Sequence, residues 1–365
     1  MTRFVFFGGK GGVGKTTMSS AFGLKCADAG LDTLVVSTDP AHSTSDVFDQ
    51  QFGDDPRAVE RRDGLWAMEI DPDEEVESHM QEIKRRMNEQ VSAAIVNEID
   101  RQIELAHRTP GAYEAALFDR FIEVMRSAAP DNAAEHASSA ERSSADRSRG
   151  RRPREDGATA SDDDYDRVVF DTSPTGGTLR LLSLPEFLGA WIDRLVEKRK
   201  RSIDLFEKAA IGDREARRKV ETDPLIAHLI ERKEKFEFAG RVLREDAAFY
   251  LVLNPDELSI RETSRTIEEL SGQGLTVDGL VVNKVTPGPD DDEQGRGGQY
   301  LRERVATERE RIDQIRAEFD QPLVARIESR VSEVKGDLLA DVARELDIPV
   351  RADGRPASGT ESAEP

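Results

Sequence analysis

The stretch FGGKGGVGKTTMSS, residues 7–20, decides the fold. Gly9 is followed by four residues and then by Gly14, Lys15 and Thr16, which is the phosphate-loop pattern G-x-x-x-x-G-K-[ST]. Lys15 is expected to reach the β- and γ-phosphates of a nucleotide, and the Thr16 hydroxyl to ligate Mg²⁺. The remaining loop positions are expected to bind the nucleotide as well: Gly9, Lys10, Gly11, Gly12, Val13, Gly14 and Thr17.

The residues on either side of this loop supply the context that the motif requires. Residues 3–7 form a short apolar, β-branched and aromatic run, which is typical of a buried parallel strand. Residues 15–30 predict a helix that ends at a glycine. Backbone N–H groups of the loop and of the helix N-terminus can then surround phosphate oxygens. A glycine-rich turn without a ligand is the alternative, and the complete pattern in this context disfavours it.

Composition narrows the function classes. The chain has 365 residues, of which 37% are hydrophobic and 34% charged, and a net charge of −21. Nucleic acid is an unfavourable partner for so acidic a chain. Only 12 of the 52 basic residues are lysine, and this acid-rich, lysine-poor composition predicts a halophilic protein. An ordinary acidic protein with a disordered tail is the alternative.

Cysteine usage and hydropathy exclude further classes. Cys26 is the one cysteine, so no disulfide within the chain and no cysteine cluster for zinc can form. The N-terminus lacks the apolar stretch of a signal peptide, and no run of about 18 apolar residues predicts a membrane span. The chain is therefore expected to be cytoplasmic.

Strands and helices alternate along the chain, which predicts an α/β fold of the P-loop NTPase type, with a mostly parallel sheet flanked by helices. One domain is expected to span residues 1–350, with a disordered tail at 351–365. The apolar runs that predict strands are residues 3–7, 33–37, 65–70, 167–171, 248–253, 279–283 and 323–327.

Two long charged regions interrupt this alternation, at about residues 73–127 and 179–245. Both predict helices, and we expect them to form an inserted helical subdomain. They either touch a partner or simply pack on the sheet and on each other. Residues 128–164 contain almost nothing apolar, so they cannot bury enough surface to become ordered and predict a disordered insertion.

Two further segments place carboxylates where a ligand would bind. DRVVFDTSPTGGTLR begins as an apolar strand that ends in Asp171, the position at which a phosphate-loop ATPase holds Mg²⁺. VVSTDPAHSTSDVF, residues 35–48, supplies Asp39 and Asp46 after another strand, at the carboxyl edge of the sheet. Capping of a helix is the alternative role of these two residues.

GGKGGVGKTT, DPAHSTSD and DTSPTGGTLRLLSLP resemble the phosphate loop, switch I and switch II of the ArsA-type ATPases. That family contains arsenite-pump ATPases and the GET-pathway factors that deliver tail-anchored membrane proteins. The resemblance implies Mg²⁺-dependent ATP hydrolysis, with Asp39 and Asp171 near Mg²⁺ and Asp46 positioning the attacking water. It implies that Lys10 crosses a dimer interface to the partner's nucleotide, and that Asn283 reads adenine.

This implied role explains why the loop holds two lysines. Two ammonium groups about 4 Å apart repel each other by roughly 4 kcal/mol at an effective dielectric constant of 20. Lys10 and Lys15 can therefore share a site only when phosphate lies between them, and Lys10 should turn away in the empty protein. Because the chain carries one phosphate loop, we expect it to pair with itself as a homodimer.

Departures from the family pattern leave the client open. The CxxC pair that clamps some targeting factors through zinc is absent, Gly177 stands where those factors often have histidine, and Glu328 stands where proline is common near adenine. The favoured function is delivery of tail-anchored proteins to a membrane receptor. The alternatives are an ATPase subunit of an arsenite or other anion exporter, which one cysteine ill suits, and a nucleotide-gated partitioning or scaffold switch.

Overall fold

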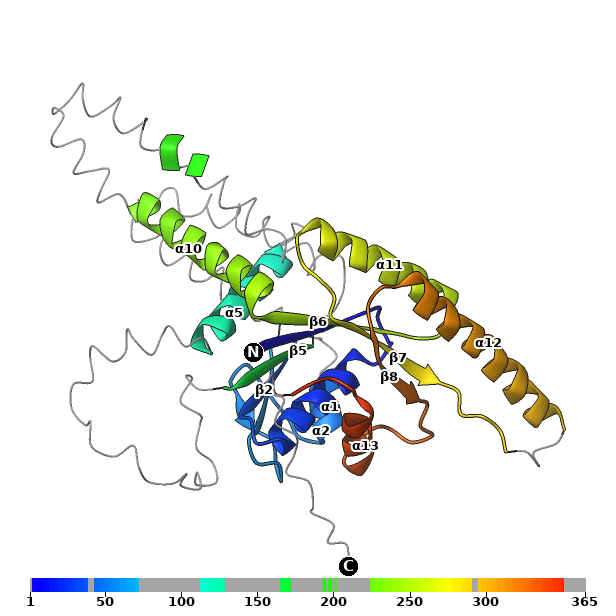
Figure 1. Cartoon of the computed structure of the whole chain (residues 1–365). Coiled ribbons are helices and arrows are strands. Elements are labelled where there is room, and N and C mark those ends of the chain that lie inside the picture. Colours follow the sequence, from blue (N-terminus) through cyan, green and yellow to red (C-terminus); the bar gives the residue numbers. More distant parts are fainter. Residues whose placement is uncertain are drawn as a thin grey trace, which may run out of the picture.

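The computed structural model describes residues 2–38, 43–71, 112–128, 165–171, 193–194, 196–198, 201, 224–290 and 295–350. These residues build an eight-stranded sheet with the order β3-β4-β2-β5-β1-β6-β7-β8 (Figure 1). Every described neighbouring pair is parallel except β3 with β4. The predicted α/β fold with a mostly parallel, helix-flanked sheet is confirmed.

All seven predicted strands are present, with ends that shift by at most two residues. They are β1 (Phe4–Gly8), β2 (Thr33–Ser37), β4 (Leu65–Glu69), β5 (Arg167–Asp171), β6 (Ala247–Leu253), β7 (Gly279–Val285) and β8 (Leu323–Glu328). The sequence did not predict the short edge strand β3 (Arg57–Ala58), whose two residues are both exposed. A strand of two residues is too short to show an alternation of apolar and polar side chains. The extended conformation of β3 therefore depends on its pairing with β4.

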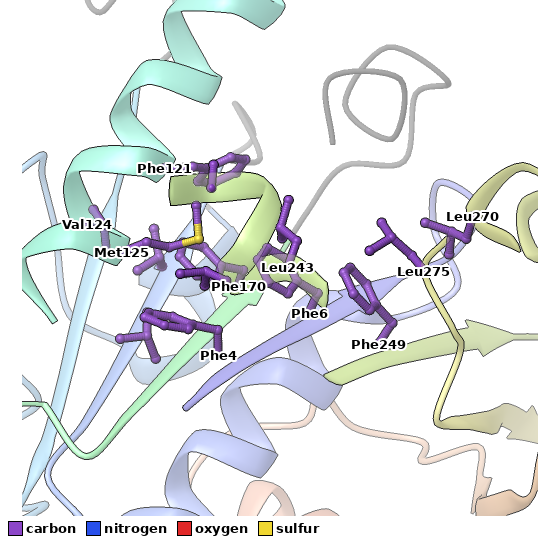
Figure 2. Close-up of a cluster of buried hydrophobic side chains, with 14 of the residues drawn as sticks. Phe4, Phe6, Phe121, Val124, Met125, Phe170, Leu243, Phe249, Leu270 and Leu275 are labelled. Carbon is purple, nitrogen blue, oxygen red and sulfur yellow. The ribbon is translucent and has the colours of Figure 1, made fainter. Parts of the chain in front are cut away.

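Alternate side chains of the central strands enter two separate hydrophobic cores, because successive residues of a strand point to opposite faces. In β1, Phe4 and Phe6 belong to one core, and Val5 and Phe7 belong to the other. Several phenylalanines pack together in the first core, which Figure 2 shows above neighbouring strands. The Phe6 ring stacks on Phe170 of β5 at 4.6 Å and on Phe249 of β6 at 5.1 Å between centroids.

The helices divide between these two faces (Figure 1). The Phe4 face is covered by α5 (Ala112–Ser127), α10 (Pro224–Glu245), α11 (Glu257–Gly272) and α12 (Arg296–Glu318). The Val5 face is covered by α1 (Lys15–Asp28), α2 (Ser43–Phe48) and α13 (Asp337–Glu345). The sheet is thus buried on both sides, as its near-continuous apolar strands require.

The described parts of the two charged regions pack directly on the sheet. Phe121 of α5 meets Phe170 of β5 edge to face at 5.1 Å, and Phe118 stacks on Phe236 of α10 at 6.0 Å between centroids. The rest of the predicted helical subdomain, residues 129–164 of the predicted insertion and the predicted tail lie outside the described residues. Among the helices that are described, none has the length and apolarity needed to cross a bilayer.

Candidate functional site

The phosphate loop connects β1 to α1, and two of its glycines, Gly9 and Gly14, have no room for a side chain. Gly9 has φ 141°, and a Cβ built there would lie 2.1 Å from the carbonyl oxygen of Val252 in β6. Gly14 has φ 95°, and its Cβ would lie 2.3 Å from Nδ2 of Asn283. Positive φ at both positions further favours glycine. The loop is therefore shaped by close approach to β6 and β7, which leaves a cradle of backbone at the start of α1.

Lys15 begins α1 and folds back over this cradle. Its side chain is buried, and its Nζ donates a hydrogen bond to the carbonyl oxygen of Lys10 at 3.2 Å. Both residues belong to the loop, so the ammonium group lies against the backbone that would surround phosphate. An anion at the helix N-terminus beside this ammonium group would be stabilised by charge and by free backbone N–H groups.

A hydroxyl and a carboxylate meet at the first turn of α1. Thr16 Oγ1 lies 2.5 Å from Asp171 Oδ2, and Ser37 Oγ lies 3.3 Å from the same oxygen. They meet because β5 lies between β1 and β2 in the sheet, so the carboxyl ends of these strands share one edge. Oxygen ligands of this kind suit Mg²⁺, which is commonly held by one or two carboxylates and by phosphate. The residues present therefore fit the predicted metal.

The segment that carries Asp46 is fixed to the end of β4. Ser45 donates from its backbone N–H and from its hydroxyl to the buried carboxylate of Glu69, both at 2.8 Å. Asp46, the next residue in α2, is exposed, so its carboxylate faces solvent at the sheet edge. Asp39 lies outside the described residues, as does the segment that follows Asp171. The structure thus places Thr16 with Asp171, and it places Asp46 on a neighbouring element.

Lys10 points away from the cradle. Its Nζ lies 3.8 Å from Oε2 of Glu262 in α11, and both side chains are partly exposed. The ammonium groups of Lys10 and Lys15 therefore face different surroundings, as the repulsion between them requires. The predicted role of Lys10 in a partner's site stays a prediction.

Two consecutive residues of β7 hold the outer side of the loop. Asn283 is buried, and its Nδ2 donates to the carbonyl oxygen of Val13 at 2.7 Å. Lys284 is exposed, and its Nζ donates to the carbonyl oxygen of Gly12 at 2.6 Å. The sequence singled out Asn283 for adenine, whereas its amide here contacts the loop backbone. The sequence did not single out Lys284, because in a regular strand the side chains of Asn283 and Lys284 would point to opposite faces of the sheet.

The anion-transporting ATPase family matches residues 2–133 and 157–347, which is most of the chain. The chain belongs to this family. The predicted ArsA-type family and the predicted ATPase class are therefore confirmed. The unmatched stretch, 134–156, lies inside the segment predicted to be an insertion.

Individual relatives of this ArsA-type chain carry two kinds of name. A provisionally named arsenical pump-driving ATPase 2 from Aquifex aeolicus is 29% identical over 87% of this chain and 89% of its own length. A provisionally named arsenical pump-driving ATPase from Halobacterium salinarum is 30% identical over 93% of this chain, but over 43% of its own length. A protein named ATPase get3 from Neurospora crassa is 28% identical over 92% of this chain and 87% of its own length.

Proposed function

We propose that this ArsA-type chain hydrolyses ATP to ADP and phosphate at the loop of residues 9–17, with Mg²⁺ as cofactor. One observation carries this proposal: the Thr16 hydroxyl lies 2.5 Å from the Asp171 carboxylate at the N-terminus of α1. Bound Mg²⁺ would neutralise charge on the β- and γ-phosphates. Thr16 and Asp171 would hold it, and Asp39 is proposed to lie near it.

The remaining site residues act on the phosphates and on water. The loop N–H groups and Lys15 hold and orient the triphosphate, which is the larger part of catalysis in phosphoryl transfer. Asp46 orients the attacking water and accepts its proton. Lys10 enters from a second copy of the chain and stabilises the charge that develops on the transferred group. Asn283 supports the loop and, when nucleotide is bound, contacts adenine.

We further propose that the chain works as a homodimer that delivers tail-anchored membrane proteins to a membrane receptor. Relatives named ATPase get3 and ATPase ASNA1 homolog, over most of their own lengths, support this choice within the family. The single phosphate loop supports self-pairing, because Lys10 can serve another nucleotide only in a second copy.

Names of other relatives favour a second candidate, the ATPase subunit of an arsenical pump. The chemistry of Cys26 disfavours it. Arsenite is thiophilic and is held by several thiolates, whereas this chain has one cysteine. That thiol is buried, and burial raises its pKa to about 12, so it is not a thiolate near neutral pH.

Two experiments test these proposals. Asp171→Asn should reduce Mg²⁺-dependent hydrolysis by about a hundredfold or more, since it removes a charged ligand, while Asp166→Asn at the opposite end of β5 should not. Equal activity of Asp171→Asn and wild type would contradict the metal site. For the client, the Asp46→Asn protein should be isolated with ATP from its own cells. Co-purified tail-anchored proteins support delivery, and an exporter subunit supports the pump.

A further inference from the structure

We propose that Lys284 is a nucleoside-contacting residue, with its ammonium group fixed on the phosphate loop and its aliphatic stem covering the ribose and base. This inference rests on the proposed nucleotide site and extends it to a residue that the loop motif does not include. It is carried by the shape of β7, by the contact between Lys284 and Gly12, and by the order of strands in the sheet.

A bulge at the carboxyl end of β7 turns two neighbouring side chains toward one loop. In the pairing of β7 with β8, Val282 lies opposite Arg326 and Val285 lies opposite Glu328, so β7 holds one extra residue between them. Lys284 within this bulge has φ 57°, which is uncommon for a residue other than glycine. Bulges of this kind re-aim side chains beside functional sites.

The result is a pair of hydrogen bonds to consecutive carbonyl groups of the phosphate loop. Asn283 reaches the Val13 oxygen from a buried position, and Lys284 reaches the Gly12 oxygen at 2.6 Å from an exposed one. In a planar trans peptide the carbonyl points away from the N–H of the same unit. Lys284 therefore holds the carbonyl side of the loop and stays outside the phosphate cradle itself.

The order of strands indicates which part of a nucleotide would lie beside Lys284. The Thr16–Asp171 pair marks the metal end, where β5 and β2 lie on one side of β1. A Mg²⁺ ion held by this pair would act on the β- and γ-phosphates, so the ribose and base of a bound nucleotide would extend in the other direction. That direction leads over β6 to β7 (Figure 1). Lys284 is the last residue but one of β7, so it lies near the carboxyl end of this strand.

The chemistry of lysine suits a nucleoside at this place. Lysine packs its methylene stem along apolar surface while its ammonium group stays bonded elsewhere, and a cation beside an aromatic face is attracted to it. With its ammonium group held on the Gly12 carbonyl, the stem of Lys284 loses little further freedom when a base covers it. The side chain is exposed in the described part of the chain, so this surface is accessible.

The test compares two ligands that both carry three linked phosphates, of which only one carries a nucleoside. Dissociation constants of ATP and of inorganic tripolyphosphate, each with Mg²⁺, are measured by calorimetry for wild type, Lys284→Ala and Lys284→Arg. Lys235→Ala, which removes a lysine of α10 paired with Glu231, is the matched control. Thermal melting of each variant checks that it is folded.

Lys284→Ala should weaken ATP binding about tenfold, or about 1.4 kcal/mol, and tripolyphosphate binding less than about twofold. Lys284→Arg should restore ATP binding to within about threefold of wild type, and Lys235→Ala should leave both ligands unchanged. Equal losses for the two ligands would overturn the proposal, because Lys284 would then act through the loop alone, and unchanged ATP binding would overturn it too. Failure of the proposed function looks different, since wild type would then bind neither ligand.

Discussion

Lys10 Nζ lies 3.8 Å from Glu262 Oε2, so the second lysine of the phosphate loop is paired with α11 and not with the phosphate cradle. The sequence predicts that Lys10 turns away from Lys15 when no phosphate separates them, and this stays a prediction. The structure adds that Glu262 of α11 is the acidic group beside Lys10. Glu262 is thus an electrostatic partner for Lys10. Docking of Lys10 on a partner's nucleotide requires that this pair be broken.

Glu262→Gln should make closure around ATP easier. Both side chains are partly exposed, so the pair contributes at most about 1 kcal/mol. Its loss should lower the ATP concentration for half-maximal hydrolysis by up to about fivefold, with a smaller effect at high salt. Glu269→Gln, at an exposed position of the same helix, is the control and should leave this concentration unchanged. An unchanged half-maximal concentration in Glu262→Gln would show that the pair does not restrain Lys10.

Asp46→Asn should preserve ATP binding and dimer formation while hydrolysis is nearly abolished, because only the positioning of water is lost. Fixed placement of α2 through Ser45 and Glu69 argues that the amide would occupy the same position. Asp49→Asn removes a second exposed carboxylate three residues away and should hydrolyse ATP normally. Calorimetry measures binding, and phosphate release measures turnover. Normal turnover in Asp46→Asn would assign the water to another residue.

The sequence predicted the sheet and part of the site because these depend on local patterns. A continuous apolar run predicts a strand that is buried on both faces, and each of the seven predicted runs is a strand in the structure. A loop after β1 and a carboxylate after β5 must approach each other if these strands are adjacent and parallel. The contact between Thr16 and Asp171 therefore follows from a motif, a strand end and a fold class.

The contacts that the sequence could not predict depend on backbone irregularity or on long-range pairing. Lys284 reaches the loop because β7 contains a bulge. The sequence of this strand, GLVVNKV, does not predict a bulge. Lys10 meets Glu262 across more than two hundred residues, and either side chain has many other exposed charges as possible partners. Asp39 lies outside the described residues, so its expected place near Mg²⁺ stays a prediction.

The buried carboxylate of Glu308 should make stability depend on pH. It accepts hydrogen bonds from the N–H and hydroxyl of Thr286, both at 2.7 Å, and from Arg304 at 2.9 Å. Burial alone would raise the pKa of Glu308, but these hydrogen bonds outweigh burial, and the pKa lies below its ordinary value. The stabilisation is thus present above the unfolded pKa, near 4.5, and is lost as pH falls through the lower folded value.

Glu308→Gln should therefore lower the free energy of unfolding by about 1–3 kcal/mol at pH 7. The difference from wild type should shrink as the pH falls below the unfolded pKa of about 4.5. Denaturant titrations at several pH values measure both quantities. Glu310→Gln, an exposed change on the same helix, should remain close to wild type throughout. A pH-independent difference for Glu308→Gln would contradict the lowered pKa.

The acidic composition predicts a fold that needs salt. With a net charge of −21, repulsion among surface carboxylates opposes the compact state. At about 1 M salt the screening length is roughly 3 Å, which suppresses this repulsion. The melting temperature should thus rise with KCl concentration, and NaCl at equal ionic strength should act similarly if screening is the cause. A flat or falling curve would contradict the predicted adaptation to salt.

Action of Lys10 across a dimer interface can be tested by mixing two inactive variants. Lys10→Ala and Lys15→Ala should each be nearly inactive, since a cation donated by a partner resembles an arginine finger, whose loss costs roughly 10³–10⁵ in rate. The two proteins are mixed and allowed to exchange subunits. In a mixed dimer the subunit with intact Lys15 receives intact Lys10 from its partner, and the other site lacks both lysines.

Random pairing makes about half of the dimers mixed, each with one complete site, so roughly a quarter of wild-type activity should return. If Lys10 served the nucleotide of its own subunit, neither site of a mixed dimer would be complete and no activity would return. A failure could also arise if closure needs ATP in both subunits, so cross-linked mixed dimers serve as the control. Cross-linked mixed dimers that bind ATP and close but do not hydrolyse it would refute the role of Lys10 in the partner's site.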